Sequence, residues 1–290
     1  MKRRLCAALV VALGLFVSAP AVPAESAAGP GMAGDEALKL LKDGNARYAA
    51  GQSTHPNAGG ERRAATAKNT PQPLAAILGC SDARVPLELV FDQGLGDIFA
   101  VRVAGNVAGP DELASVEYAV AQLDTPVLLV LGHTECGAVK AAAQNARVQG
   151  SLPFLLNQIR PAVAKARAWS PTASGDELLD KAIKANVWLV MENIIRKSAE
   201  VRKRVQQGRL LLVGGVYDLH SGQVNWLGAH PDQGKILVSA SKRPAAPKPR
   251  PAPAPVQGEA PARSDTVDQG SMIDLPPDAP AAASPAPAHQ

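Results

Sequence analysis

Residues 74–84 read Leu-Ala-Ala-Ile-Leu-Gly-Cys-Ser-Asp-Ala-Arg, and residues 127–136 read Val-Leu-Leu-Val-Leu-Gly-His-Thr-Glu-Cys. Each stretch opens with an apolar run that is typical of a buried strand, and each run leads directly into polar and sulfur-containing side chains. Open α/β sheets place their sites at the carboxyl ends of their strands. The two stretches therefore predict a sheet protein whose functional site lies where these two strands end.

The residues that follow the two runs form a ligand set for a metal ion. Cys80, His133 and Cys136 offer two thiolates and one imidazole, which together suit the borderline-soft zinc ion. Three protein ligands leave the fourth corner of a tetrahedron open, as in catalytic rather than structural zinc sites. Cys136 is expected in the first turn of a helix, where backbone N–H groups favour a thiolate. We therefore predict Zn²⁺ as the cofactor.

Two charged residues beside Cys80 can control such a site. Asp82 can accept a hydrogen bond from a zinc-bound hydroxide, and Arg84 can pair with Asp82 through a bidentate fork that keeps the carboxylate ionised and off the metal. Other interpretations stay open at this point. Asp82 and Arg84 could form a purely structural ion pair, and Cys80 and Cys136 could form a disulfide or act as small buried hydrophobes.

The pattern Cys-x-Asp-x-Arg followed by His-x-x-Cys resembles the β-class carbonic anhydrases. The resemblance extends to residues 91–99 and 102–106 and to the segments 215–219 and 222–224, and it covers roughly residues 35–240. It implies an α/β fold with a central, mostly parallel sheet of four to five strands flanked by helices. It also implies a zinc lyase that reversibly hydrates carbon dioxide to bicarbonate and a proton by zinc-bound hydroxide.

The resemblance also assigns roles to individual residues. It makes Cys80, His133 and Cys136 the zinc ligands and gives catalytic roles to Asp82 and Arg84. In the related enzymes the counterpart of Asp82 can swing to zinc as a fourth ligand, which closes the site. These enzymes build their carbon dioxide pocket partly from a neighbouring subunit, so a homodimer or higher homo-oligomer is implied.

Two positions depart from the family pattern. Many members carry Gln-x-Pro ahead of the first strand, whereas residues 71–73 read Pro-Gln-Pro here, which puts a pocket role for Gln72 in doubt. Some members carry a tryptophan of an inhibitory bicarbonate site where this chain has Ile77, so we expect no such regulation. Two other functions stay open: hydrolysis of an analogue such as carbonyl sulfide or carbon disulfide, and a non-catalytic zinc-stabilised binding module.

The two ends of the chain differ in composition from its middle. Residues 1–24 have a basic start, an apolar run and small residues before Glu25, as a secretory signal peptide does, and an uncleaved anchor is the alternative. Residues 25–34 are predicted to be a flexible linker, 35–240 the catalytic domain, and 241–290 a disordered tail rich in proline and alanine. The predicted location is the periplasm or the exterior, without stable membrane insertion, since the apolar run is short for a bilayer.

The charge balance bears on which partners to expect. The formal net charge is +4, but Lys2, Arg3 and Arg4 lie in the predicted signal peptide, and without them 27 basic residues face 26 acidic ones. A nearly neutral mature chain gives no electrostatic reason to expect nucleic acid binding. Carbon dioxide and bicarbonate are the expected small-molecule partners.

The rest of the pattern alternates between strands and helices. Further strands are predicted over 98–103, 210–217 and 223–227, the last two joined as a hairpin. Helices are predicted over 35–48, 61–68, 110–123, 136–147, 153–169 and 176–206, with a short helical segment that ends at Phe91.

Overall fold

A computed structural model describes residues 32–242 of the 290-residue chain. The predicted signal peptide, most of the predicted linker and nearly all of the predicted tail lie outside the described residues. Among the described residues, no helix combines the length and the apolar character that a membrane span requires.

The centre of the fold is a five-stranded sheet in the order β2-β1-β3-β4-β5. The first four strands in this order are parallel to one another, and β5 runs antiparallel to β4. The strands are β1 (Ala75–Gly79), β2 (Ile98–Arg102), β3 (Val127–His133), β4 (Leu211–Tyr217) and β5 (Val224–Gly228). The prediction of a mostly parallel sheet of four to five strands is confirmed.

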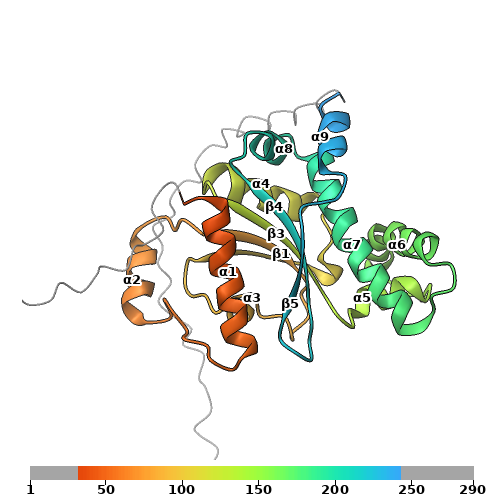
Figure 1. Cartoon of the computed structure of the whole chain (residues 1–290), viewed down its shortest axis with the longest axis horizontal. Coiled ribbons are helices and arrows are strands. Elements are labelled where there is room, and N and C mark those ends of the chain that lie inside the picture. Colours follow the sequence, from red (N-terminus) through yellow and green to blue (C-terminus); the bar gives the residue numbers. More distant parts are fainter. Residues whose placement is uncertain (1–31, 243–290) are drawn as a thin grey trace, which may run out of the picture. The chain divides into compact units, whose positions relative to one another are not determined.

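Helices cover both faces of this sheet (Figure 1). They are α1 (Gly34–Ala49), α2 (Gly60–Lys68), α3 (Leu87–Val90), η1 (Ala104–Asn106), α4 (Pro110–Gln122), α5 (Gly137–Ala143), α6 (Leu152–Trp169), α7 (Gly175–Lys197), α8 (Ala199–Gln206) and α9 (Gln233–Ser241). Every residue of β1 and β3 is buried, because both strands are central and covered on both faces. Burial on both faces explains why their sequences are continuous apolar runs rather than alternating patterns.

Alternate residues of the central strands belong to two different parts of the core. Leu78 and Val130 pack with residues of α4, α7 and α8 on one face of the sheet. Ile77 and Leu129 point to the opposite face and pack with residues of α1 and α3. This alternation follows from the two-residue period of a strand. In Figure 1, α1 and α3 accordingly lie on one side of the sheet and α7 on the other.

Two helix predictions need correction, and one helix was missed. The predicted helix 176–206 is two helices, because Ser198 is extended and its hydroxyl accepts a hydrogen bond from the backbone nitrogen of Val201 at 3.1 Å, which starts α8. The apolar period continues across this break, since Val201 packs into the same core as α7. The predicted helix 136–147 is shorter, with Cys136 in the capping position before α5 rather than in its first turn. Helix α9 was not predicted.

A buried carboxylate joins α1 and the loop after it to the end of α3. The side chain of Asp92 is fully buried and accepts hydrogen bonds from Arg47 Nε at 2.6 Å, from the backbone nitrogen of His55 at 2.8 Å, and from the backbone nitrogen and hydroxyl of Thr54. Burial alone would raise the pKa of Asp92, but the hydrogen bonds from Thr54, Arg47 and His55 outweigh it and lower the pKa to about 2.

We expect Asp92→Asn to lower the free energy of unfolding by about 2 kcal/mol at pH 7. The folded-state pKa of Asp92 is depressed, so its stabilisation is complete above the ordinary carboxyl pKa and is lost as the pH falls from about 5 to about 2. Thermal unfolding of both proteins should show a midpoint roughly 4–8 °C lower for the variant at pH 7. The difference should fall to about half at pH 3 and approach zero only below about pH 2. A pH-independent difference would assign the loss to packing instead.

Candidate metal centre

The topology brings the two predicted halves of the site together. Cys80 directly follows β1, and His133 is the last residue of β3. The two strands are parallel neighbours, so their carboxyl ends meet at one edge of the sheet. Cys136 directly precedes α5. The turn between His133 and Cys136 brings the two residues together and contains Glu135, whose φ of 58° lies in the left-handed region.

The three side chains converge on one point inside the protein. Sγ of Cys80, a ring nitrogen of His133 and Sγ of Cys136 all lie within 4.8 Å of one another. The three residues are 4%, 0% and 1% exposed, respectively. Both cysteines are free, so the disulfide interpretation of this pair is wrong.

The state of His133 tests whether these residues fit a metal ion. Its Nδ1 lies 2.8 Å from the carbonyl oxygen of Thr134, a contact that places the ring proton on Nδ1. Nε2 is then an acceptor, and it is buried without a hydrogen-bond partner. A buried imidazole nitrogen without a partner, next to two thiols, is the arrangement that a metal ligand requires. The residues therefore fit a metal ion.

The surroundings of the two sulfurs favour negative charge on Cys80. Hydrogen bonding from Cys136 lowers the pKa of the Cys80 thiol to about 4, although burial opposes this shift. The same contact, together with burial, raises the pKa of Cys136. The backbone nitrogen of Gly105 donates to Sγ of Cys80 at 3.2 Å. Gly105 has φ of 68°, and an added Cβ would lie 2.6 Å from Ile159, so this close approach requires glycine.

Asp82 lies at the edge of this cluster, held by Arg84. Nε and Nη2 of Arg84 donate to the two carboxylate oxygens of Asp82 at 3.0 and 2.9 Å, which is the bidentate fork expected from the sequence. These hydrogen bonds hold the pKa of Asp82 well below its usual range. Oδ2 of Asp82 lies 3.9 Å from Nε2 of His133. The ionised carboxylate therefore faces the point where the three ligand atoms converge.

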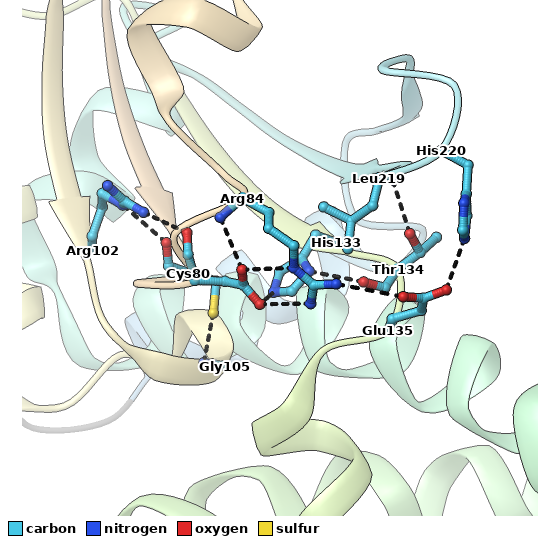
Figure 2. A network of polar contacts seen from close by, with 10 residues as sticks. Cys80, Arg84, Arg102, Gly105, His133, Thr134, Glu135, Leu219 and His220 are labelled. Atoms are coloured by element: carbon cyan, nitrogen blue, oxygen red, sulfur yellow. Dashed lines mark hydrogen bonds and ion pairs between the residues drawn. The ribbon is translucent and has the colours of Figure 1, made fainter. Parts of the chain in front are cut away.

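Sequence reasoning missed a residue that holds the turn after β1. Nε of Arg102 donates to the carbonyl oxygen of Cys80 at 3.0 Å, and its Nη2 donates to that of Asp82 at 2.7 Å (Figure 2). Arg102 ends β2 and lies opposite Gly79 in the parallel register, which places it next to the turn. Its sequence signals were its position near the end of the predicted strand 98–103 and its place in the stretch 102–106 that resembles the family, and neither signal gave it a contact.

A second missed contact lies on the other side of Arg84. Glu135 lies with Oε2 3.5 Å from Nη1 of Arg84 and with Oε1 2.8 Å from Nε2 of His220 (Figure 2). The contact with Glu135 raises the pKa of His220, and His220 in turn lowers the pKa of Glu135. These residues are 85 positions apart in the chain, so no local pattern could have joined them.

The fold and the site together define an α/β protein with a two-cysteine, one-histidine metal centre at the carboxyl ends of parallel strands. The family model described as carbonic anhydrase matches residues 75–224. A carbonic anhydrase of Mycolicibacterium smegmatis is 38% identical over 193 residues, which cover 65% of this chain and 90% of that protein. A carbonic anhydrase of Pseudomonas aeruginosa is 38% identical over 164 residues, covering 53% of this chain and 73% of that protein. The chain belongs to the carbonic anhydrase family.

Solved structures agree with this assignment and specify the class. The β-carbonic anhydrase CafA of Aspergillus fumigatus is 28% identical, with a TM-score of 0.56 over 70% of this chain and 96% of that one. A tetrameric β-carbonic anhydrase of Sordaria macrospora shares the fold at 24% identity, with a TM-score of 0.53 over 63% of this chain and 91% of that one. The family resemblance predicted from the sequence is confirmed as β-class.

Proposed function

We propose that this chain catalyses the reversible hydration of carbon dioxide to bicarbonate and a proton, with a zinc ion held by Cys80, His133 and Cys136. The observation that carries this proposal is the buried, partnerless Nε2 of His133, which meets two sulfurs beside a carboxylate fixed by an arginine. When bound, zinc supplies a hydroxide nucleophile from water at neutral pH.

The residues of the chain direct this chemistry. Asp82, kept ionised by Arg84, accepts the hydrogen bond of the attacking oxygen and so turns a lone pair of that oxygen toward carbon dioxide. Arg102 fixes the backbone that carries Cys80 and Asp82, so the carboxylate stays in register with the ligands. Cys80 and Cys136 belong to an apolar cluster, and in such surroundings these charge interactions are stronger than in water.

Stopped-flow measurement of carbon dioxide hydration on zinc-loaded protein tests this proposal. We expect a rate well above that of buffer, with one zinc ion per chain. A parallel assay of sulfide release from carbonyl sulfide and carbon disulfide tests the analogues as substrates. Sulfide release without hydration would overturn the proposal, as would stoichiometric zinc without hydration, which would indicate a binding module.

We further propose that the chain is exported and assembles as a homo-oligomer. Export is supported by the sequence of residues 1–24, and assembly by the description of the Sordaria macrospora relatives as tetrameric. Amino-terminal sequencing of protein from a periplasmic or secreted fraction should give a chain that begins at or near Glu25. Light scattering coupled to gel filtration should give a mass of at least two chains. An intact amino terminus or a monomer would contradict the respective proposal.

A further inference from the structure

Arg84 has two acidic partners, of which only one belongs to the proposed chemistry. Its Nε and Nη2 bind Asp82, whereas its Nη1 lies 3.5 Å from Glu135. The other carboxylate oxygen of Glu135 lies 2.8 Å from His220. In Figure 2 the side chains of Arg84, Glu135 and His220 form a row joined by dashed lines. Asp82 continues this row through its two hydrogen bonds with Arg84.

The backbone presents Glu135 and His220 to each other in a fixed arrangement. The backbone nitrogen of Thr134 donates to the carbonyl oxygen of Tyr217 at 2.9 Å, and the hydroxyl of Thr134 accepts from the backbone nitrogen of Leu219 at 3.0 Å. These bonds join the turn after β3 to the turn after β4. The left-handed φ of 58° at Glu135 is uncommon outside glycine, so the first turn is itself constrained.

We infer that Glu135 and His220 are positioning residues that hold Arg84 in the orientation in which it pairs with Asp82. By doing so they favour the state of the site in which Asp82 stays away from the metal and the fourth coordination position is open. The inference rests on the proposed function, because Asp82 competes for that position only when a metal is bound.

This row of side chains can fix the orientation of Arg84, but it cannot relay a proton. A guanidinium in a protein keeps its proton, so Arg84 cannot pass one from Asp82 to Glu135. The side chains of Arg84, Glu135 and His220 are 53%, 53% and 78% exposed. Exposed ion pairs shift an equilibrium by about fivefold or less. The expected effect is therefore a bias between two states of the site, not an absolute requirement.

Anion binding to the cobalt-substituted enzyme measures this bias without using the hydration rate. Thiocyanate would compete with Asp82 for the fourth position on cobalt, so its apparent Kd, read from the visible absorption of cobalt, should rise as the open fraction falls. Where the two states are equally populated, a fivefold bias toward the closed state raises the apparent Kd about threefold. We therefore expect Glu135→Gln and His220→Ala to bind thiocyanate about threefold more weakly than the parent at pH 7.

Electrostatics alone predicts the opposite result for Glu135→Gln, because removing a negative charge near the site should tighten anion binding. Glu88→Gln serves as the matched control, since Glu88 is an exposed carboxylate on α3 outside the row. His220→Gln keeps a donor for Glu135 and should restore a Kd close to that of the parent.

The inference is overturned if Glu135→Gln binds thiocyanate as tightly as the parent or more tightly while its thermal midpoint is unchanged. Hydration by the parent enzyme, measured separately, distinguishes the two proposals. A parent that hydrates carbon dioxide, with no loss of thiocyanate affinity in the variants, refutes only the positioning role. A parent that does not hydrate carbon dioxide refutes the proposed function itself.

Discussion

Replacing Asp82 with asparagine should lower kcat/KM for carbon dioxide hydration by about 10²- to 10³-fold and leave one zinc ion bound per chain. Asparagine has nearly the same shape, but its amide group presents N–H donors where Asp82 presents a second acceptor to Arg84. The fork is then broken on one side, and the charge that orients the attacking oxygen is lost. The metal ligands are untouched, so rate and metal content should separate.

A matched control for this variant exists in the same chain. Asp92→Asn makes the same chemical change at a carboxylate that is also held by an arginine but lies among α1, the loop after α1 and the end of α3. This control variant should lower the free energy of unfolding but leave kcat/KM of the folded protein nearly unchanged. If Asp82→Asn retained a rate within about threefold of the parent, Asp82 and Arg84 would be a structural ion pair, which is the interpretation that the sequence left open.

The parts of the fold that follow from local pattern were predictable. Strands β1 and β3 are central and buried on both faces, so their sequences are unbroken apolar runs that are easily recognised. Because the carboxyl ends of parallel strands lie at the same edge of a sheet, the two runs predicted a shared site, and the ligand chemistry of the residues after them predicted the cluster.

The parts that depend on contacts between distant segments were not predictable. Arg102 binds two backbone carbonyl groups of the turn after β1, and carbonyl acceptors leave no trace in a sequence. Glu135 and His220 meet because two turns are bonded together, which becomes visible only once β3 and β4 are paired. The break at Ser198 was hidden for the opposite reason, since the apolar period runs through it without interruption.

The second large effect concerns the metal itself. We expect Cys136→Ser to lower the affinity for zinc by at least about 10²-fold, since loss of a mere outer-shell partner already costs about 10- to 100-fold. A serine hydroxyl is nearly isosteric with the thiol but stays protonated at neutral pH, so it offers neither the charge nor the softness that zinc selects. The purified variant should hold little zinc after dialysis and show a hydration rate close to that of buffer, while circular dichroism reports an intact fold.

Metal removal from the parent protein separates the loss of a ligand from damage to the fold. Chelated parent protein should lose its hydration activity and regain it when one equivalent of zinc is added. The reason is that the sheet and α5 hold the backbone of Cys80, His133 and Cys136 in place, with their ligand atoms within 4.8 Å of one another. The variant should recover only at zinc concentrations far above one equivalent. A serine variant that kept stoichiometric zinc through dialysis would show that Cys136 is not a ligand. The assignment of the whole site would then fail, because a tetrahedral site with one open position needs three protein ligands and Cys80 and His133 supply only two.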